Sequence, residues 1–316
     1  MASLRDVGER ALISNMMKRI RPTGKYGPGD DAAVIRMGGD TVLSTDIVTF
    51  ARHAPKGITY VEFGWMAAAV NFSDIASMGA DPVGILVSFA MPADLDESSL
   101  YEMMDGIDQC AEFCEATILG GDTKTGEGLI CCTAVGDMYG RSPLTRSGAK
   151  PGDVVAVTGT LGSAAAGFYA IQHDIDEKDA ISSLKTPIPR MKEGVMLAQC
   201  NVTSCMDISD GLSTTVLEVC SKSNVGMDIL WDSLPVGSGV DRITEYVSKE
   251  HMMLDFGGDY ELLFTFNRDD IERLYNCGLE FTIIGRVNDS GVANILKDGC
   301  TMEVCNGGYE HFKDRS

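Results

Sequence analysis

Between Thr59 and Met78 the chain reads TYVEFGWMAAAVNFSDIASM, a stretch so rich in apolar residues that it predicts a long helix packed in a core. Residues Val83–Met91, VGILVSFAM, follow shortly after and predict a strand. Similar elements continue on both sides of this pair. We expect strands at Thr41–Asp46 and Leu129–Met138 and a helix at Leu95–Cys114. The first half of the chain therefore mixes α and β elements.

A turn-rich stretch, Ser147–Asp153, separates this half from a second one. We place the boundary near residue 148, so that two domains cover residues 1–148 and 149–316 of the 316-residue chain. In the second half, strand Val154–Thr158 leads through glycines into a helix. Later helices are expected near 211–222 and 268–277, and strands near 261–266 and 281–287. The predicted fold class is α/β, of the α+β type, with two mixed domains.

The composition limits the kinds of partner. The chain has 26 Lys and Arg against 46 Asp and Glu, and this net charge of −20 disfavours binding to nucleic acid. No apolar run reaches the roughly 20 residues of a membrane helix, and residues 1–21 lack the apolar core of a signal peptide. We therefore expect a cytoplasmic protein without a membrane partner. Its ten cysteines are expected to be reduced thiols, and their spacing disfavours a zinc site.

Asp74 is the most informative single residue. Between Glu62 and Asp81 it is the one ionisable side chain, and on a helical wheel apolar residues surround it almost completely. A carboxylate in such a helix needs a charged partner, a hydrogen bond or a metal ion, because unpaired burial costs several kcal/mol. An acidic protein can bind a polyphosphate when divalent cations lie between its carboxylates and the phosphate oxygens.

Two acidic segments precede this helix. Asp30 and Asp31 follow a Gly/Pro turn, where two adjacent like charges need a cation or solvent. Ser44, Thr45 and Asp46 are expected at the end of a strand and offer the hard oxygen ligands that magnesium takes. A solvated acidic turn remains the alternative interpretation of the first segment.

Three glycine-containing segments with carboxylates follow later. Gly120-Gly121-Asp122-Thr123 is expected as a turn between a helix and a strand. Asp207-Ile208-Ser209-Asp210-Gly211-Leu212 comes before a helix, where capping would account for one of its polar side chains. Phe256–Leu263 runs through two glycines into a strand that begins with Asp259 and Glu261.

Two further features are candidates for binding phosphate. Val157–Ala164 passes from a strand through glycines into a helix, a shape that can expose backbone N–H groups, although it lacks the Lys-Ser/Thr ending of a Walker A loop. Arg146 lies at the domain boundary. Each segment alone is compatible with a structural role. Together, with four histidines in the chain and no Ser/His/Asp nucleophile signature, they favour multi-magnesium phosphoryl transfer.

In this order the motifs resemble those of the thiamine-monophosphate kinase family, and the likeness covers nearly the whole chain. That family belongs to an ATP-binding superfamily with aminoimidazole ribonucleotide synthetase, selenide water dikinase and a hydrogenase maturation factor. The motifs are Gly29-Asp30-Asp31-Ala32-Ala33, Ser44-Thr45-Asp46, Asn71-Phe72-Ser73-Asp74-Ile75-Ala76-Ser77-Met78-Gly79-Ala80, Gly120-Gly121-Asp122-Thr123, Asp207-Ile208-Ser209-Asp210-Gly211-Leu212 and Gly257-Gly258-Asp259-Tyr260-Glu261-Leu262.

The resemblance implies a homodimer in which the strands of the N-terminal domain form a dimeric β-barrel, and a C-terminal α/β domain that completes the active site. It also implies several Mg²⁺ ions, ATP as co-substrate, and direct in-line transfer of the γ-phosphoryl group to thiamine monophosphate, giving thiamine diphosphate without a phosphoenzyme.

Roles for individual residues also follow from the resemblance alone, and no covalent nucleophile is among them. His53 has a structural alternative as a loop histidine. The implied metal ligands are Asp30, Ser44, Thr45, Asp46, Asp74, Asp122, Asp207 and Asp210; the ATP contacts are Tyr101, Gly121, Asp122, Arg146 and Ser209; the contacts to the thiamine part of the substrate are His53, Glu261 and Tyr309.

Other functions fit the sequence less well. A selenide water dikinase is expected to carry a reactive cysteine or selenocysteine near its N-terminus, whereas Cys110 is the first cysteine, and the hydrogenase maturation factor is expected to end in a cysteine, whereas this chain ends in Ser316. The glycine motifs match aminoimidazole ribonucleotide synthetase less closely. A non-catalytic thiamine-phosphate or nucleotide sensor would not need every carboxylate, and a metal-dependent phosphatase would not need ATP.

Overall fold

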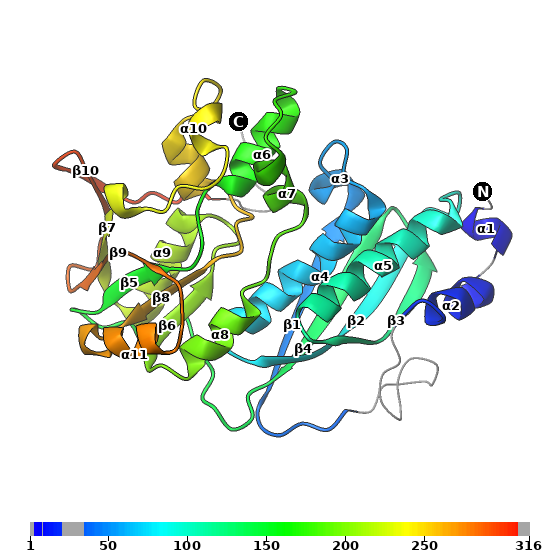
Figure 1. Ribbon diagram of the computed structural model, residues 1–316, viewed down its shortest axis with the longest axis horizontal. Coiled ribbons are helices and arrows are strands. Elements are labelled where there is room, and N and C mark those ends of the chain that lie inside the picture. The colour runs from blue at the N-terminus through cyan, green and yellow to red at the C-terminus, as the bar shows by residue number, and fades with distance from the viewer. Residues whose placement is uncertain (1–2, 8, 21–34, 309–316) are drawn as a thin grey trace. The chain divides into compact units, whose positions relative to one another are not determined.

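The computed structural model describes residues 3–7, 9–20 and 35–308. The chain divides into two compact units, one of residues 1–75 and 80–140 and the other of residues 76–79 and 141–316 (Figure 1). Each unit contains both helices and strands. The expectation of two mixed α/β domains is therefore confirmed, and the boundary near residue 148 stays a prediction.

The first unit is built on an open four-stranded sheet of order β1-β4-β2-β3. β4 pairs antiparallel with β1 and β2, and β2 pairs parallel with β3. Two long helices, α4 and α5, lie side by side against one face of the sheet (Figure 1). The strands are β1 Thr41–Thr49, β2 Asp81–Met91, β3 Thr117–Thr125 and β4 Leu129–Asp137, and the helices are α1 Leu4–Val7, α2 Glu9–Met17, α3 Phe50–His53, α4 Tyr60–Ser77 and α5 Glu97–Phe113.

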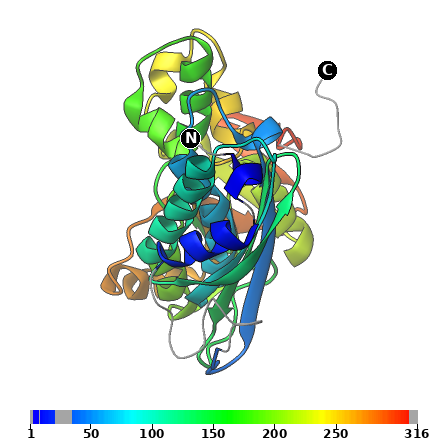
Figure 2. The same cartoon turned by 90° about the vertical axis from the view of Figure 1, so that its right-hand side faces the viewer.

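The two faces of this sheet differ in burial. On the helix side, Phe72 of α4, Met103 of α5 and Ile85 of β2 are all fully buried. On the opposite side Leu43 and Ile47 of β1 are 65% and 53% exposed. Figure 2 shows β1 as the long strand along the edge of the sheet. An apolar strip at an open sheet edge leaves surface that a protein partner could cover.

The α4–α5 packing depends on two glycines. A Cβ atom added to Gly64 of α4 would overlap the Met103 carbonyl oxygen, and one added to Gly106 of α5 would overlap the Val61 carbonyl oxygen. The two backbones therefore approach more closely than any side chain permits.

The second unit is built on a seven-stranded sheet of order β11-β10-β7-β9-β5-β8-β6. All its neighbouring pairs are antiparallel except β7 and β10. The strands are β5 Val154–Val157, β6 Val202–Asp207, β7 Gly226–Leu230, β8 Leu262–Phe266, β9 Thr282–Asn288, β10 Ala293–Lys297 and β11 Cys300–Glu303; the helices are α6 Ser163–Gln172, α7 Lys178–Lys185, α8 Met191–Ala198, α9 Leu212–Ser223, α10 Val240–Ile243 and α11 Ile271–Asn276, with short helical turns η1 Trp231–Ser233, η2 His251–Asp255 and η3 Arg268–Asp270.

Helices cover both faces of this sheet, so its central strands are apolar on both sides. In β8, Phe264 and Phe266 belong to one core with Leu197 of α8, whereas Leu263 belongs to the other core with Val216 of α9. Alternation along one strand thus supplies both cores. This explains why residues 262–266 read as an almost continuous apolar run.

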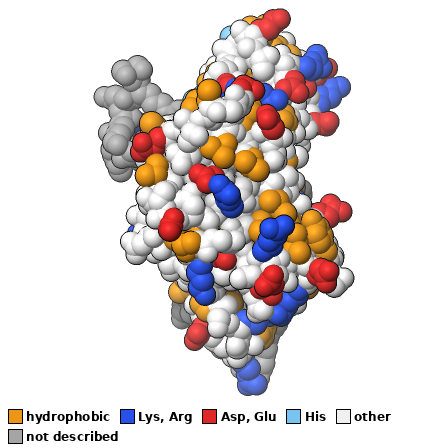
Figure 3. Space-filling model, turned by 90° about the vertical axis from the view of Figure 1, so that its left-hand side faces the viewer, with side chains coloured by type: hydrophobic (Ala, Val, Ile, Leu, Met, Phe, Trp, Pro, Cys, Tyr) orange, Lys and Arg blue, Asp and Glu red, His pale blue; other side chains and the backbone are white. Residues whose placement is uncertain are grey.

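The surface of the second unit mixes charged and apolar side chains. Figure 3 shows small apolar patches separated by acidic and basic residues on one face. Exposed apolar side chains of this unit include Tyr275, Leu230 and Met302. Every helix within the described residues is too short or too polar to cross a lipid bilayer.

The close approach of α4 and α5 gives a stability prediction. We expect Gly106→Ala to lower the free energy of unfolding by about 1–3 kcal/mol, because the added methyl group forces the helices apart and this outweighs the better helix propensity of alanine. Gly120→Ala is the control, since a Cβ there meets its nearest atom at 3.6 Å. Urea unfolding followed by circular dichroism measures both. Wild-type stability of Gly106→Ala would contradict the packing argument.

Candidate functional site

The Ser44-Thr45-Asp46 motif lies in the middle of β1, not at its end as predicted. The strand continues to Thr49 because Ile47 and Val48 extend the pairing with β4. Alternation puts Ser44 and Asp46 on the side of α4 and Thr45 on the open side. These three predicted metal ligands therefore face in two directions.

On the helix side, β1 is held to α4 by two polar contacts. The Ser44 hydroxyl donates a short hydrogen bond to Asp74 Oδ2, and the Asp46 N–H donates to Asn71 Oδ1 at 3.0 Å. Asn71 is fully buried and Asp74 is half-buried. Asp74 therefore has a hydroxyl partner on the neighbouring strand, and Ser44 and Asp74 form a pair of hard oxygen donors.

On the open side, the Thr45 hydroxyl belongs to a short chain of hydrogen bonds. It donates to the Cys132 carbonyl oxygen and accepts from the Thr133 hydroxyl, both at 2.9 Å. Both of these partners are on the neighbouring strand β4.

Gly120-Gly121-Asp122-Thr123 lies within strand β3, and the prediction of a turn is wrong. Ile85 pairs with Ile118 and Leu86 with Gly120, so an irregularity in the β2–β3 register precedes the motif. A Cβ on Gly121 would overlap the Val87 carbonyl oxygen of β2, so this position requires glycine. A glycine pair looks like a turn in sequence, but here Gly121 allows two neighbouring strands to lie close together.

Asp122 projects from β3 into solvent. It lies 3.1 Å from Lys124 Nζ and accepts from the Thr123 N–H at 2.8 Å. The Lys124 hydrogen bond, followed by that of Thr123, lowers the pKa of the Asp122 carboxyl group below 3.8. Asp122 is therefore an ionised carboxylate at neutral pH, as a cation ligand must be.

Asp122 and the β1 motif are far apart within one chain. β1 and β3 are the two edges of the sheet, with β4 and β2 between them. Three strand spacings amount to roughly 14 Å, so one ion cannot bind both Asp122 and the Ser44–Asp74 pair. In residues 3–7, 9–20 and 35–308, no three His, Cys, Asp or Glu side chains are grouped as a metal site. Asp30 lies outside the described residues.

The predicted ligand contacts Tyr101 and His53 lie elsewhere in the first unit. The Tyr101 hydroxyl, on α5, donates to Glu97 Oε2 at 3.1 Å and accepts from Asn15 Nδ2 of α2 at 3.0 Å. His53 ends α3, and its Nδ1 accepts from the Thr49 N–H at 3.1 Å. Both side chains thus have structural partners that help to fix neighbouring elements.

In the second unit, the two remaining acidic motifs lie side by side. The Gly258 N–H donates to the Ser209 carbonyl at 2.8 Å, and the Ile208 N–H donates to the Glu261 carbonyl at 2.7 Å. Their strands, β6 and β8, pair antiparallel. Asp207 ends β6 and is 2% exposed. Two segments separated by about fifty residues in sequence thus form one acidic loop pair.

The loop before α9 does not cap this helix with a side chain. Its N-cap is Gly211, at φ 96°, and no side chain caps it. The expected explanation of one polar residue in the motif by capping is therefore wrong, and Ser209 and Asp210 are half-buried in the loop. Gly308, the last described residue, lies beside Asp210 and Thr214. Tyr309 lies outside the described residues, and Arg146 is exposed in the loop before β5.

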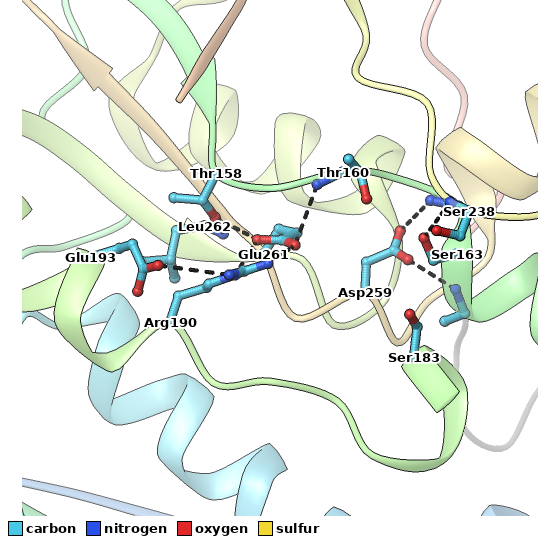
Figure 4. A network of polar contacts seen from close by, with 12 residues as sticks. Thr158, Thr160, Ser163, Ser183, Arg190, Glu193, Ser238, Asp259, Glu261 and Leu262 are labelled. Atoms are coloured by element: carbon cyan, nitrogen blue, oxygen red, sulfur yellow. Dashed lines mark hydrogen bonds and ion pairs between the residues drawn. The ribbon is translucent and has the colours of Figure 1, made fainter. Parts of the chain in front are cut away.

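Glu261 is the centre of a polar network (Figure 4). Arg190 binds it through two parallel hydrogen bonds, Nε to Oε2 at 2.6 Å and Nη2 to Oε1 at 2.5 Å. The Thr158 hydroxyl donates to Oε2 at 2.7 Å, and the Thr160 N–H donates to Oε1 at 3.4 Å. Glu261 is 4% exposed. Burial lowers the pKa of Arg190, but the hydrogen bonds and charge of Glu261 outweigh it and raise this pKa.

Asp259 occupies the N-terminus of α6 in the same network. Its Oδ2 accepts from the Gly162 N–H at 2.7 Å, and its Oδ1 accepts from the Ala164 N–H at 3.2 Å. The turn at Val157–Ala164 was expected to offer such groups to a phosphate. In this structure the Asp259 carboxylate accepts from these N–H groups and occupies the place where a phosphate was expected.

Arg190 is the residue of this network that sequence reasoning missed. It follows Thr186-Pro187-Ile188-Pro189 and is the N-cap residue of α8. An arginine after a proline-rich segment carries no chemical signature of its own. Its partner Glu261 lies 71 residues further along the chain, a pairing that spacing alone cannot reveal.

The environment of Asp259 predicts a pH dependence of stability. Burial of the carboxyl group raises its pKa from 3.8 to about 7, against the lowering effect of the N–H groups of α6. The pKa of Asp259 is higher in the folded than in the unfolded chain, so the protonated carboxyl group contributes to the free energy of unfolding. This contribution is complete below pH ~4 and is lost as the pH rises through ~7. Relative to wild type, Asp259→Asn should gain up to about 1.4 kcal/mol of unfolding free energy per pH unit across this window.

Urea unfolding at pH 4, 5, 6 and 7 tests this, with Asp241→Asn as the control because Asp241 is an exposed carboxylate of the same unit. Parallel pH profiles of Asp259→Asn and wild type would show that Asp259 is ionised throughout and that the N–H groups of α6 dominate.

Comparison with known proteins places the chain in a family. Residues 29–138 match the N-terminal domain, and residues 150–297 the C-terminal domain, of the family described as AIR synthase related protein. Thiamine-monophosphate kinase of Methanospirillum hungatei is 34% identical over 94% of this chain and 98% of its own length. The Escherichia coli K12 enzyme of that name is 33% identical over 96% and 98%.

Solved structures agree. AaThiL complexed with AMPPCP and TMP has a TM-score of 0.77 at 28% identity and covers 99% of both chains. The hydrogenase maturation protein HypE in complex with ATP has a TM-score of 0.81 over 96% of this chain, but at 19% identity it shows a shared fold alone. With more than 30% identity along nearly their full length to curated kinases of this name, the chain belongs to the thiamine-monophosphate kinase family.

Proposed function

We propose that this chain transfers the γ-phosphoryl group of ATP to thiamine monophosphate and releases thiamine diphosphate and ADP. The observation that carries the proposal is the full-length similarity to enzymes of this name, together with a structural relative that covers 99% of the chain and is complexed with AMPPCP and TMP. The chain is thus a phosphotransferase with a phosphate group as acceptor. A cytoplasmic location stays a prediction.

We also propose that the reaction uses Mg²⁺. Ser44 with Asp74, and the ionised Asp122, offer hard oxygen donors in separate places. Mg²⁺ is usually held by one or two carboxylates, water and substrate phosphates and not by a dedicated protein cage. A dispersed set of carboxylates therefore fits nucleotide-bound magnesium. The proposed ligands remain Asp30, Ser44, Thr45, Asp46, Asp74, Asp122, Asp207 and Asp210.

When bound, Mg²⁺ neutralises charge on the transferred phosphoryl group. The task of the chain is then to position two anions in line and to stabilise the charge that develops. The proposed contacts are Tyr101, Gly121, Asp122, Arg146 and Ser209 for ATP, and His53, Glu261 and Tyr309 for the thiamine part.

A second copy of the chain is the proposed partner. The open face of the four-stranded sheet exposes Leu43, Ile47 and Leu86, of which Leu43 is 65% exposed. Two such sheets, joined along these faces and edges, would give the dimeric β-barrel implied by the family resemblance. Because Asp122 and the β1 motif are too far apart to share an ion within one chain, a homodimer would also let different copies supply them.

The first experiment is an assay with ATP, Mg²⁺ and thiamine monophosphate, in which thiamine diphosphate and ADP are separated by chromatography. We expect equal amounts of both products, none with thiamine as the acceptor, and loss of turnover with excess EDTA. ADP formation only with another acceptor would overturn the substrate. Binding of thiamine monophosphate without turnover would point to a sensor.

The metal assignment predicts a large loss of activity in Asp74→Asn. We expect kcat to fall by at least about a hundredfold, because one preorganised electrostatic contact is worth ~10²–10³ in rate, while the melting temperature stays within a few degrees. Glu127→Gln removes one exposed carboxylate of the same unit and is the control. Near-normal turnover of Asp74→Asn would remove Asp74 from the metal site.

The dimer proposal predicts that a charge on the open sheet face yields monomers. In light scattering after size-exclusion chromatography we expect Ile47→Asp to have half the mass of wild type, since burying an unpaired carboxylate is costly. Ile188→Asp, at a 40% exposed isoleucine of the second unit, should leave the mass unchanged. A dimeric Ile47→Asp variant, or a monomeric wild type, would overturn this interface.

A further inference from the structure

The Glu261 carboxylate has no acceptor site to spare. Two carboxylate oxygens have about four lone-pair positions. Oε2 accepts from Thr158 Oγ1 and Arg190 Nε, and Oε1 accepts from Arg190 Nη2 and the Thr160 N–H. A substrate could bond directly to Glu261 only by displacing one of these donors. The proposed contact of Glu261 to the thiamine part would therefore require one of these donors to move, whereas the other partner of the pair, Arg190, keeps N–H donors that a ligand could accept from.

The guanidinium of Arg190 has a second edge. Nε and one N–H of Nη2 are used by Glu261, which leaves Nη1 and the other N–H of Nη2 as a second pair of parallel donors. In the part of the chain that the structure describes, the acidic group beside this edge is Glu193, whose Oε1 is 3.7 Å from Nη1, too far for a hydrogen bond. The Arg190 side chain is 27% exposed, and the adjoining Gly159 and Thr160 are exposed.

The surroundings fix this orientation. Gly159 has φ 47°, and a Cβ there would overlap Glu261 Oε1 and approach Arg190 Nη2. The Thr158 hydroxyl that donates to Glu261 also accepts from the Leu262 N–H at 2.8 Å. The Glu261 carboxylate is thus held by the Thr158 hydroxyl and the Thr160 N–H, and it holds the guanidinium in one plane (Figure 4).

We propose that Arg190 binds a phosphate group of the substrates through its second edge, with Glu261 as the residue that positions it. This deepens the proposed function by naming a phosphate contact. A guanidinium matches phosphate geometry with two parallel hydrogen bonds, and one already aligned by a buried carboxylate loses little further freedom on binding. The phosphate is that of thiamine monophosphate or of ATP, and the test separates these two sources.

A purely structural role is the alternative. The pair fastens the start of α8 to the start of β8, and removing one partner of a buried ion pair destabilises a protein strongly. Stability alone therefore cannot distinguish the two roles. A variant of Glu193 can distinguish them, because Glu193 places a negative charge beside the second edge of Arg190. Removing this charge should strengthen binding of an anion at that edge, whereas a purely structural ion pair predicts no change in anion binding.

The experiment measures binding by calorimetry to full-length protein with Mg²⁺ for two matched ligand pairs: thiamine monophosphate against thiamine, and ATP against adenosine. The variants are Arg190→Lys, which keeps the charge but loses the planar fork, Glu193→Gln, and Glu245→Gln. The last is the control, since Glu245 is an exposed carboxylate of the same unit. Melting temperatures confirm that each variant is folded.

We expect Arg190→Lys to weaken binding of one phosphorylated ligand by roughly tenfold and to leave its unphosphorylated counterpart within about twofold. Glu193→Gln should tighten the same ligand by roughly twofold to fivefold, and Glu245→Gln should change neither. The ligand that responds identifies the phosphate. Equal effects of Arg190→Lys on both members of each pair, or no effect of Glu193→Gln, would overturn the proposal.

This outcome is separable from that of the kinase assay. If the chain fails to phosphorylate thiamine monophosphate but ATP binding responds to Arg190→Lys and Glu193→Gln as described, the proposed function is wrong and the phosphate contact stands. If turnover is found but no phosphorylated ligand responds, the function stands and Arg190 is structural.

Discussion

The alternation of side chains along a strand is the constraint on which both the cores and the site depend. In β8 it sends Phe264 and Leu263 into different cores, so one strand holds helices on both faces of the larger sheet. In β1 the same rule turns Ser44 toward Asp74 and Thr45 toward the open face. The side chains of Ser44, Thr45 and Asp46 therefore cannot all bind one ion, although they are neighbours in the sequence. A motif within a strand must be assigned to a face before its residues are combined into a site.

Much of the architecture could be predicted from the sequence, because long apolar segments have a clear period. The helix near Thr59–Met78 appears as α4, and the strands near Val83–Met91 and Leu129–Met138 appear as β2 and β4. The prediction failed where glycine has two uses. Gly120-Gly121 looks like a turn, yet Gly121 lies within β3, where the lack of a side chain lets the strand approach Val87 of β2 closely. The expected helix near 268–277 is split into η3 and α11, because Asn267 accepts from the Asp269 N–H and starts a tighter turn.

The sequence predicts the candidate site as a set of carboxylates, but it does not predict how they are arranged. Sequence alone identified Asp74, because a lone charge among apolar residues needs a partner, and α4 indeed offers it to Ser44 of β1. It could not reveal that Asp259 would neutralise the N–H groups of the glycine turn at α6, since that contact joins residues 97 positions apart. It also gave no reason to single out Arg190. Long-range pairs of this kind are set by strand order, which local pattern does not encode.

The ion pair of Arg190 and Glu261 is difficult to explain by stability alone. Burying two charges removes their hydration, and well-packed apolar residues at such places are often equally or more stabilising. The pair nevertheless receives two further donors from Thr158 and Thr160 and a glycine that makes room for it. That arrangement orients a guanidinium more than it strengthens a core, because Thr158 and Thr160 both donate to the carboxylate. Among the described residues, the acidic group beside the outer edge of Arg190 is Glu193, whose Oε1 is 3.7 Å from Nη1 and too far for a hydrogen bond. The chain has a net charge of −20, and its proposed substrates are anions, so a cation held in a fixed plane would offset part of the repulsion between them. Its fixed orientation is the strongest physical reason to place it against phosphate.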